Sequence, residues 1–321
     1  SLINLLYFNM LKFLLRWEFT CFLSGILLAL SFSPTDLFYA PFVALALLFK
    51  ALDQANWKQA LFRGGFFGFG FFGVAVSWVF VSIYFYGHAH IVLAVLLTLI
   101  FCLFWSLSIV LFATLSVSLT VPGSYSRIFI MPVIWCLVEY FRGQFIFNGF
   151  PWLQIAYSQF ETPFSGFIPV IGAYGVGFLM AICSSLIVIV STYKKGFFLF
   201  PILILLVSYS ANYLKHTIWT FPDGKPLTVT LLQGNVSQDN KWDPSYKDKT
   251  LDWYKSKTEQ HWDSDLIIWP ETAIPAFQHE IDADFLTPLS DDAKRHDTAL
   301  IVSLPIKNNE KGEYYNAALT L

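Results

Sequence analysis

Charged residues are distributed so unevenly along this sequence that it contains two chemically different parts. Residues 1–214 carry 14 charged side chains, whereas the following 107 residues, 215–321, carry 28. Over the whole chain 56% of residues are apolar and 13% are charged, against about 45–50% and about 25% in an average soluble domain. We therefore expect a membrane domain over 1–214, followed by a water-exposed domain over 215–321.

Seven apolar segments precede residue 215, and each is a candidate membrane-spanning helix. A helix needs about 20 apolar residues to cross a bilayer, and the second and fifth segments are short at their apolar centres. No small-residue cleavage site follows the first segment, so it is not interpreted as a cleaved signal peptide. The segments are 10–32, 37–52, 64–84, 90–121, 127–141, 165–193 and 196–213.

The positively charged residues predict the orientation in the membrane. Connections 31–36, 84–90 and 142–164 hold only Arg142, whereas the alternate connections hold eight lysines and arginines. Because cytoplasmic connections are enriched in Lys and Arg, the N-terminus is expected in the cytoplasm. Seven spans then place 215–321 on the periplasmic side of a bacterial inner membrane. The eight residues are Lys12, Arg16, Lys50, Lys58, Arg63, Arg127, Lys194 and Lys195.

The connection 142–164 has an unusual composition for a loop. It is too aromatic for a solvated loop and too interrupted by Gly and Pro for one long helix. It is either an interfacial anchor or a lipid-contacting wall beside an active site, and composition favours neither. Just before it, Glu139 and Arg142 lie three residues apart, and a structural ion pair near the interface is expected because charges at membrane depth are costly.

Cysteine usage and net charge exclude several classes of function. All four cysteines (Cys21, Cys102, Cys136 and Cys183) fall in apolar segments, so we expect packing residues without disulfides, metal sites or a catalytic thiolate among them. The formal net charge of −2 provides no basic surface for nucleic acid. No motif indicates a cofactor.

The charged part shows short apolar strands alternating with polar helices. Strands are predicted at 227–232, 265–269, 298–304 and 314–321, and helices at 245–262 and 282–296. Asp243 and Pro244 have the residue types of a helix start. The alternation predicts an α/β domain.

Glu271 stands out in this domain because it follows an apolar strand directly. Functional groups of α/β sheets gather at the carboxyl ends of strands, and neighbouring Trp269, Pro270 and Ile274 are expected to desolvate the carboxylate partly. Such a group is suited to act as a general base. The alternative is a solvent-facing turn or cap residue.

Four stretches of the chain together resemble one known family. Residues 269–275 (WPETAIP) are similar to the first catalytic motif of nitrilase-superfamily domains, in the form found in apolipoprotein N-acyltransferases. Residues 232–235 (LQGN) with 241–244 (KWDP), 149–154 (GFPWLQ) with 157–159 (YSQ), and 314–318 (YYNAA) resemble the same family. The order of these motifs and the expected topology also fit, so the resemblance covers the whole chain.

The resemblance implies an activity, a fold and a set of site residues. The family transfers a fatty acyl chain from a phospholipid, through a cysteine thioester, to the α-amine of a diacylglyceryl-cysteine on an apolipoprotein. The implied fold is a helical membrane domain followed by a nitrilase-like αββα sandwich. Glu271 is implied as the general base, and Trp242, Trp152 and Asn316 as substrate-contacting residues. Interfacial anchoring is the alternative for both tryptophans, and a turn or strand-edge position is the alternative for Asn316.

One departure from the family pattern concerns the rest of its catalytic machinery. In the family a Lys and a Cys follow the Tyr-Asn strand, whereas here Lys307 and Lys311 precede it and no cysteine follows Cys183. We therefore expect a C-terminally truncated or fragmentary chain that is inactive alone, with an incomplete sandwich. The alternatives are a non-catalytic lipid-binding membrane protein, a gene relic, or a membrane-tethered nitrilase-like amidase.

Overall fold

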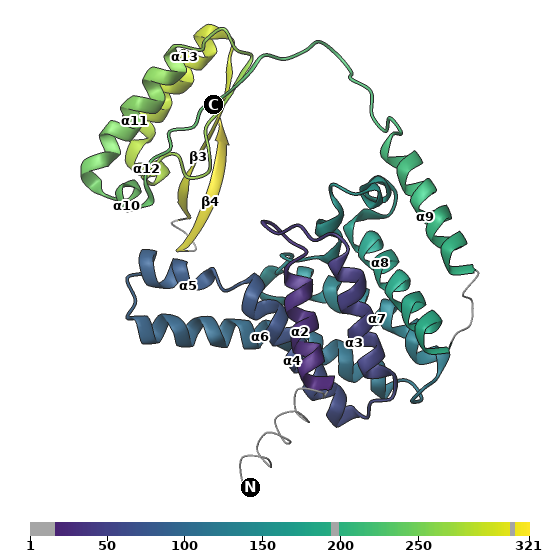
Figure 1. Ribbon diagram of the computed structural model, residues 1–321. Helices are drawn as coiled ribbons and strands as arrows, with labels where there is room; N and C mark the ends of the chain where they lie inside the picture. Colours follow the sequence, from purple (N-terminus) through teal and green to yellow (C-terminus); the bar gives the residue numbers. More distant parts are fainter. Residues whose placement is uncertain (1–16, 194–198, 309–311) are drawn as a thin grey trace. The chain divides into compact units, whose positions relative to one another are not determined.

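The computed structural model describes residues 17–193, 199–308 and 312–321 of the chain (Figure 1). Two compact units are present, Ser1–Thr220 and Phe221–Leu321. Several charges used for the predictions lie outside the described residues, together with the start of the first apolar segment; they are Lys12, Arg16, Lys194, Lys195 and Lys311.

Helices make up most of the first unit, in agreement with the apolar composition of its sequence. The longest are α6 (Ile91–Ser118) and α8 (Ile168–Tyr193), and α8 follows directly on the short helix η4 (Pro163–Phe167). The other long helices are α2 (Trp17–Ala29), α3 (Ala40–Asp53), α4 (Trp57–Ala75), α7 (Tyr125–Gln144) and α9 (Leu199–Lys215). Shorter turns of helix are α5 (Val79–Val81), η1 (Ser82–Tyr86), η2 (Ile146–Asn148) and η3 (Ile155–Gln159).

Two helices among the described residues are long and apolar enough to cross a bilayer, Ile91–Ser118 and Pro163–Tyr193. A third candidate span is formed by Trp57–Ala75 and Val79–Tyr86, which are bent by 55° at their junction. The first unit is therefore a helical part with two or three apolar spans by length and composition. Seven spans remain a prediction from the sequence.

Helices α2 and α4 pack so closely that glycine is required at their crossing. A Cβ atom on Gly25 would lie 2.0 Å from the carbonyl oxygen of Phe67, and one on Gly70 would lie 2.2 Å from that of Phe22. Small residues allow such close backbone approach between helices in an apolar environment. The glycines in these two segments therefore determine which helix faces meet.

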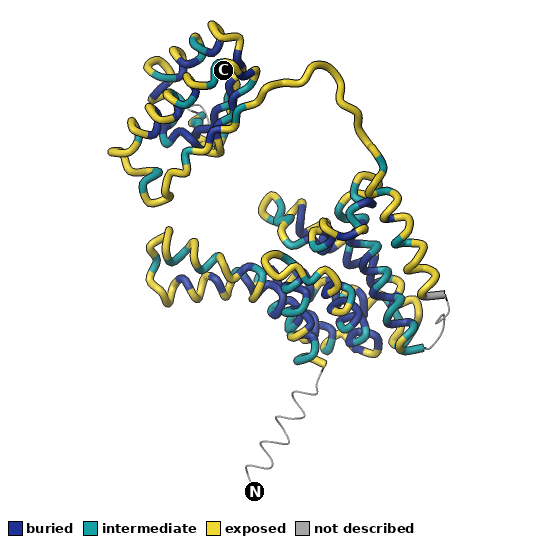
Figure 2. The backbone as a smooth tube through the Cα atoms, turned by 45° about the horizontal axis from the view of Figure 1, so that its top comes forward, coloured by how far each residue is buried: buried dark blue, intermediate teal, exposed yellow. Residues whose placement is uncertain are grey.

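Several phenylalanine side chains fill the interior of the helical unit. Many other large apolar side chains are exposed on its surface. Phe49, Phe67, Phe72 and Phe112 are fully buried. Figure 2 shows buried positions concentrated where the helices cross, while the first half of α6 is largely exposed. Ile100 on α6 is 61% exposed, which suits a surface in contact with lipid.

The second unit contains one four-stranded sheet in the order β1-β2-β3-β4. Strands β1 (Val229–Leu231), β2 (Leu266–Ile268) and β3 (Ala299–Asn308) are parallel, and β4 (Glu313–Thr320) is antiparallel to β3. These strands occupy the four predicted segments. The α/β class is thus confirmed.

Helices of this unit share a core with one face of the sheet. On β3, the alternate residues Leu300, Val302 and Leu304 are completely buried, as expected from the two-residue period of a strand. Tyr254 on α11 (Pro244–Glu259) and Leu289 on α13 (Thr287–His296) belong to the same core. Shorter helices are α10 (Gln238–Lys241), α12 (Gln278–Ile281) and η5 (Asp282–Leu286).

Asp243 begins α11, as its residue type predicts. Its carboxylate accepts a hydrogen bond from the backbone N–H of Ser245 at 2.8 Å, and this bond lowers the pKa of Asp243 below its ordinary value. Pro244 occupies the first turn. The cap therefore fixes the residue at which α11 begins. The preceding segment, 238–243, borders the site described next.

Candidate functional site

A polar cleft of about 210 Å³ lies beyond the carboxyl ends of the parallel strands β1 and β2. Residues that follow β1 in the chain line one wall of the cleft, and residues that follow β2 line the other. This is the position where parallel sheets commonly bind ligands. The lining residues are Gln233, Asn235, Val236, Lys241, Thr250, Tyr254, Pro270, Glu271, Thr272 and Ala273.

The structure brings Glu271 and Asn316 together at this cleft. The Asn316 side-chain amide, on β4, donates a hydrogen bond of 2.6 Å to Oε1 of Glu271. Thr272 Oγ1 donates to Oδ1 of the same amide at 3.4 Å. Glu271 Oε2 has no hydrogen-bond partner among the described residues. One carboxylate oxygen of Glu271 is thus held in place by Asn316.

Ser303 on β3 supports the turn that follows Glu271. Its hydroxyl accepts a hydrogen bond from the backbone N–H of Thr272 at 3.0 Å, and its carbonyl accepts one from Ile274 at 3.2 Å. Thr272 has a φ of 48°, a left-handed conformation that is uncommon for a threonine. Two bonds from one strand residue therefore hold the unusual turn. No sequence motif had indicated Ser303.

The opposite wall of the cleft is held by Tyr254. Its hydroxyl accepts a hydrogen bond of 3.2 Å from the backbone N–H of Gly234, and burial raises the pKa of this phenol. A Cβ on Gly234 would lie 2.7 Å from the Tyr254 hydroxyl. The half-buried Lys241 also lines the cleft. No sequence feature points to Tyr254 as a site residue, whereas Lys241 lies within the KWDP motif.

Glu271 is more exposed than the sequence analysis predicts, because its neighbours do not cover the carboxylate. Trp269 and Ile274 are buried, but Glu271 and Pro270 are exposed. The reason is that the indole of Trp269 belongs to the core, where its Nε1 donates to Thr258 Oγ1 at 3.0 Å. Glu271 therefore stands in a solvent-accessible cleft in this structure.

Trp242 does not line that cleft, and Trp152 belongs to the other structural unit. Trp242 is 55% exposed at the end of α10 and is not among the lining residues. Trp152 belongs to the helical unit, where it lines a different cavity and is 57% exposed. Its ring stacks on Phe150 at 5.6 Å, and Phe150 stacks on Trp105 of α6 at 4.2 Å. Trp152 is therefore part of an aromatic stack fixed to the helices.

A buried ion pair on α7 is bonded to the backbone of the loop that contains Trp152. Arg142 Nη2 lies 3.8 Å from Glu139 Oε1, and both residues are 4% exposed. Arg142 donates to the carbonyl of Leu153 at 3.3 Å, and the N–H of Ile155 donates to Glu139 at 3.0 Å. The loop is thus attached to α7 on both sides of Gln154. The ion pair expected from the sequence is present. Its hydrogen bonds to the loop backbone are visible only in the structure.

The cavity that Trp152 lines has a volume of about 1110 Å³. The loop between α2 and α3 provides one side, and the segment from Trp152 to Pro163 provides the other. Phe147 and Leu153 near this segment have positive φ angles of 51° and 61°, so the chain is folded tightly rather than extended. The lining residues are Phe32, Ser33, Asp36, Phe38, Trp152, Leu153, Tyr157, Ser158, Phe160, Glu161, Thr162 and Pro163.

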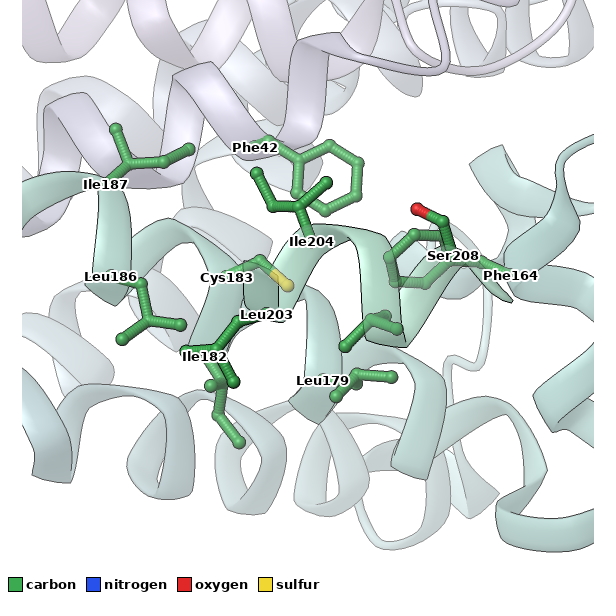
Figure 3. Close-up of a pocket in the computed structure, with 11 residues that line it drawn as sticks. Phe42, Phe164, Leu179, Ile182, Cys183, Leu186, Ile187, Leu203, Ile204 and Ser208 are labelled. Atoms are coloured by element: carbon green, nitrogen blue, oxygen red, sulfur yellow. The ribbon is translucent and has the colours of Figure 1, made fainter. Parts of the chain in front are cut away.

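A smaller apolar cavity of about 320 Å³ lies between α8 and α9. Figure 3 shows side chains of both helices, together with Phe42 and Phe164, facing one space. Among the lining residues that the structure describes, only Cys183 and Ser208 have a polar or sulfur atom in the side chain. Such a space accommodates hydrocarbon and offers no group for chemistry.

Neither a metal site nor a cysteine nucleophile accompanies Glu271 in the part of the chain that the structure describes. No group of three or more His, Cys, Asp and Glu residues there is arranged to hold a metal ion. None of the four cysteines belongs to the α/β unit that contains the Glu271 cleft. The polar groups described at this cleft include the Glu271 carboxylate, the Lys241 ammonium and the amides of Gln233 and Asn235.

Comparisons with known proteins cover both units. Residues 24–186 match the model of the apolipoprotein N-acyltransferase N-terminal domain, and residues 228–321 match that of the carbon-nitrogen hydrolase family. Proteins named apolipoprotein N-acyltransferase are similar to the chain. The one from Methylococcus capsulatus is 40% identical over 92% of this chain and 59% of its own length. The one from Coxiella burnetii is 37% identical over 93% and 62%.

A third protein of that name, from Pseudomonas syringae, is 34% identical over 91% of this chain and 58% of its own length. The chain therefore spans about three fifths of the length of these relatives. The two matched regions lie in the two structural units, one in the helical unit and one in the α/β unit.

Proposed function

Because the chain belongs to the apolipoprotein N-acyltransferase family, we propose that it forms part of an enzyme that N-acylates bacterial lipoproteins. The acyl donor is a phospholipid, and the acceptor is the α-amine of the N-terminal diacylglyceryl-cysteine of an apolipoprotein. The observation that carries this proposal is the hydrogen bond between Glu271 and Asn316 in a polar cleft at the carboxyl ends of parallel strands.

Glu271 is the proton-transferring group in this proposal. Acyl transfer through a thioester requires a base that takes the proton of the attacking thiol and returns a proton to the leaving alcohol. Asn316 holds one carboxylate oxygen in place, and the second oxygen faces no competing donor among the described residues. Fixing the carboxylate in this way reduces the orientational entropy lost when the transition state forms.

The test of this role is Glu271→Gln, which keeps the size of the side chain and removes its basicity. We expect acyl transfer to fall by about a hundredfold or more, since general base catalysis contributes roughly 10²–10⁴-fold. The gene is expressed from its complete reading frame in bacteria depleted of their own N-acyltransferase. Mass spectrometry of a lipoprotein then measures N-acylation.

The matched control for this measurement is Glu259→Gln, which changes an exposed carboxylate at the end of α11. Normal acylation by the Glu271→Gln protein would refute the assignment of the base. An amidase would instead hydrolyse small amides without transferring an acyl chain, so an amide-hydrolysis assay of the same membranes distinguishes that alternative.

The proposed orientation places the N-terminus in the cytoplasm and the α/β unit in the periplasm. Lys50 near the C-terminal end of α3, Lys58 and Arg63 in the first turns of α4, and Arg127 in the first turn of α7 support it, because positive charges mark the cytoplasmic side. This places Glu271 on the same side of the inner membrane as exported lipoproteins. It also places the cavity beside Trp152 at the outer end of the helices.

Single exposed cysteines test this orientation in spheroplasts treated with a membrane-impermeant maleimide. We expect labelling of Thr35→Cys and Asp252→Cys, and labelling of Gln54→Cys only after permeabilisation. The unsubstituted chain is the control, since Cys21 and Cys102 are buried and Cys136 and Cys183 are half-buried. Labelling of Gln54→Cys in closed spheroplasts would reverse the assignment.

A further inference from the structure

A small cavity lies between α4, α6 and α7 of the helical unit, beside the ion pair of Glu139 and Arg142. Its volume is about 10 Å³. Leu153, in the loop that contains Trp152, also lines it. Three phenylalanine rings, none more than 2% exposed, form much of the remaining wall; they are Phe71, Phe72 and Phe112. The cavity therefore lies inside the packing of three helices.

Three residues that line this cavity each bury a polar atom without a partner. Trp135, Glu139 and Arg142 occupy one face of α7, at positions i, i+4 and i+7, and each is 4% exposed. The atoms Trp135 Nε1, Glu139 Oε2 and Arg142 Nη1 form no hydrogen bond within the part of the chain that the structure describes. Burying such atoms unpaired is costly, above all in charged groups. Three of them around one cavity indicate a polar ligand.

Ser108 on α6 adds a fourth polar group to the lining. Its hydroxyl donates to the carbonyl of Trp105 at 2.7 Å, so its oxygen is left as an acceptor. With Glu139 Oε2, the cavity has two acceptors. Arg142 Nη1 and Trp135 Nε1 are two donors. One water molecule donates two hydrogen bonds and accepts two, so the lining offers the complement of a single water.

Size and charge favour water over other ligands. A volume of about 10 Å³ is close to the smallest that holds one water molecule, roughly 10–15 Å³. Among the described lining residues the charged groups are Glu139 and Arg142, which carry opposite signs. The lining therefore has no excess charge to attract an ion. An apolar gap of this size would stay dry, whereas this cavity has polar groups from two helices.

We propose that this cavity binds one water molecule between α6 and α7. The water accepts hydrogen bonds from Arg142 Nη1 and Trp135 Nε1, and it donates to Glu139 Oε2 and Ser108 Oγ. Because the ion pair also bonds to the backbone of the loop that contains Trp152, the water links α6 to the support of that loop. The site belongs to the helical unit and does not rest on the acyl transfer proposed above.

X-ray radiolysis of the full chain in a non-ionic detergent tests the site directly. Irradiation converts a bound water into a hydroxyl radical that oxidises adjacent side chains, and tandem mass spectrometry locates the oxidised residues. Phe112 lines the cavity and Phe67 does not, although both rings are completely buried. We expect Phe112 to be oxidised several-fold faster than Phe67. Equally slow oxidation of the two rings would overturn the proposal.

Ser108→Val tests whether the polar lining holds the water. It replaces a hydroxyl by a larger alkyl group, which removes an acceptor and fills the cavity. We expect the oxidation of Phe112 to slow to the rate of Phe67. Ser184→Val is the matched control, because Ser184 is completely buried on α8, bonds to its own helix and does not line the cavity. It should leave the oxidation of Phe112 unchanged.

Val138→Ile fills the same cavity from α7 without altering a polar atom. Val138 lines the cavity, so the added methylene should displace the water and slow the oxidation of Phe112 in the same way. Thermal unfolding in detergent checks that each variant folds, and either folded variant suffices for the test. Fast oxidation of Phe112 that persists in a folded Ser108→Val or Val138→Ile protein would overturn the proposal, since the oxidant would then reach the ring by another route.

Discussion

Arg127→Lys is expected to lower the stability of the helical unit by about 3 kcal/mol or more. The guanidinium is 1% exposed and donates to five backbone carbonyls and one hydroxyl. A lysine ammonium has three N–H groups and cannot reach the same acceptors. Each buried carbonyl left without a donor costs roughly 1–3 kcal/mol. The acceptors are Leu52, Asp53, Ala55, Val117 and Thr120.

Those carbonyls lie at the C-terminal ends of α3 and α6, where helices leave backbone acceptors unsatisfied. A single side chain on α7 thus joins three helices. Thermal unfolding of the purified chain in detergent measures the effect. A loss of about 3 kcal/mol corresponds to a shift of roughly 6–12 °C for a unit of this size.

Arg295→Lys is the matched control, because its ion pair with Asp292 on α13 is exposed. That substitution should change the midpoint by no more than a degree or two, since exposed ion pairs contribute little. An unchanged midpoint for Arg127→Lys would show that the bonds to the helix ends do not stabilise the unit.

Glu139→Ala is expected to cost about 3–5 kcal/mol, because it leaves the buried guanidinium of Arg142 without its partner. The loss should also release the loop, since the carboxylate accepts the N–H of Ile155. Hydrogen exchange of the Ile155 amide should therefore speed up more than that of amides in the middle of α7. Unfolding in detergent and exchange measured by mass spectrometry check the two expectations.

The double variant Glu139→Leu with Arg142→Leu separates charge burial from loop attachment. Replacing a buried pair by apolar residues is often close to neutral for stability, so the double variant should be more stable than Glu139→Ala. Its loop should still exchange rapidly, because both backbone bonds are absent. Slow exchange at Ile155 in the double variant would mean that the ion pair does not hold the loop.

Much of the architecture could be predicted because it depends on local sequence. The change in charge density distinguishes the helical part from the α/β part, since burial in apolar surroundings requires apolar residues throughout a segment. The four strands and the start of α11 at Asp243 follow from short apolar runs between polar segments and from capping chemistry. The catalytic role of Glu271 and the roles of both tryptophans remain predictions.

The composition of the site could be predicted only in part. The motif around Glu271 drew attention to that residue, but its bond to Asn316 joins positions 45 residues apart. The bond depends on the register between β3 and β4, in which Asn316 lies opposite Pro305. A shift of one residue would turn Asn316 to the other face of the sheet. Ser303 and Lys241 also lie near Glu271 through contacts between segments that are far apart in the sequence.

Sequence by itself determined which segments are apolar, which alternate as strands, and which motif carries Glu271, because these properties belong to neighbouring residues. Tertiary structure decided which distant side chains meet. It joined Glu271 to Asn316, left Trp242 outside the lining of the Glu271 cleft, and attached the Trp152 loop to Glu139 and Arg142. Such contacts are set by strand register and helix packing, which no single segment specifies.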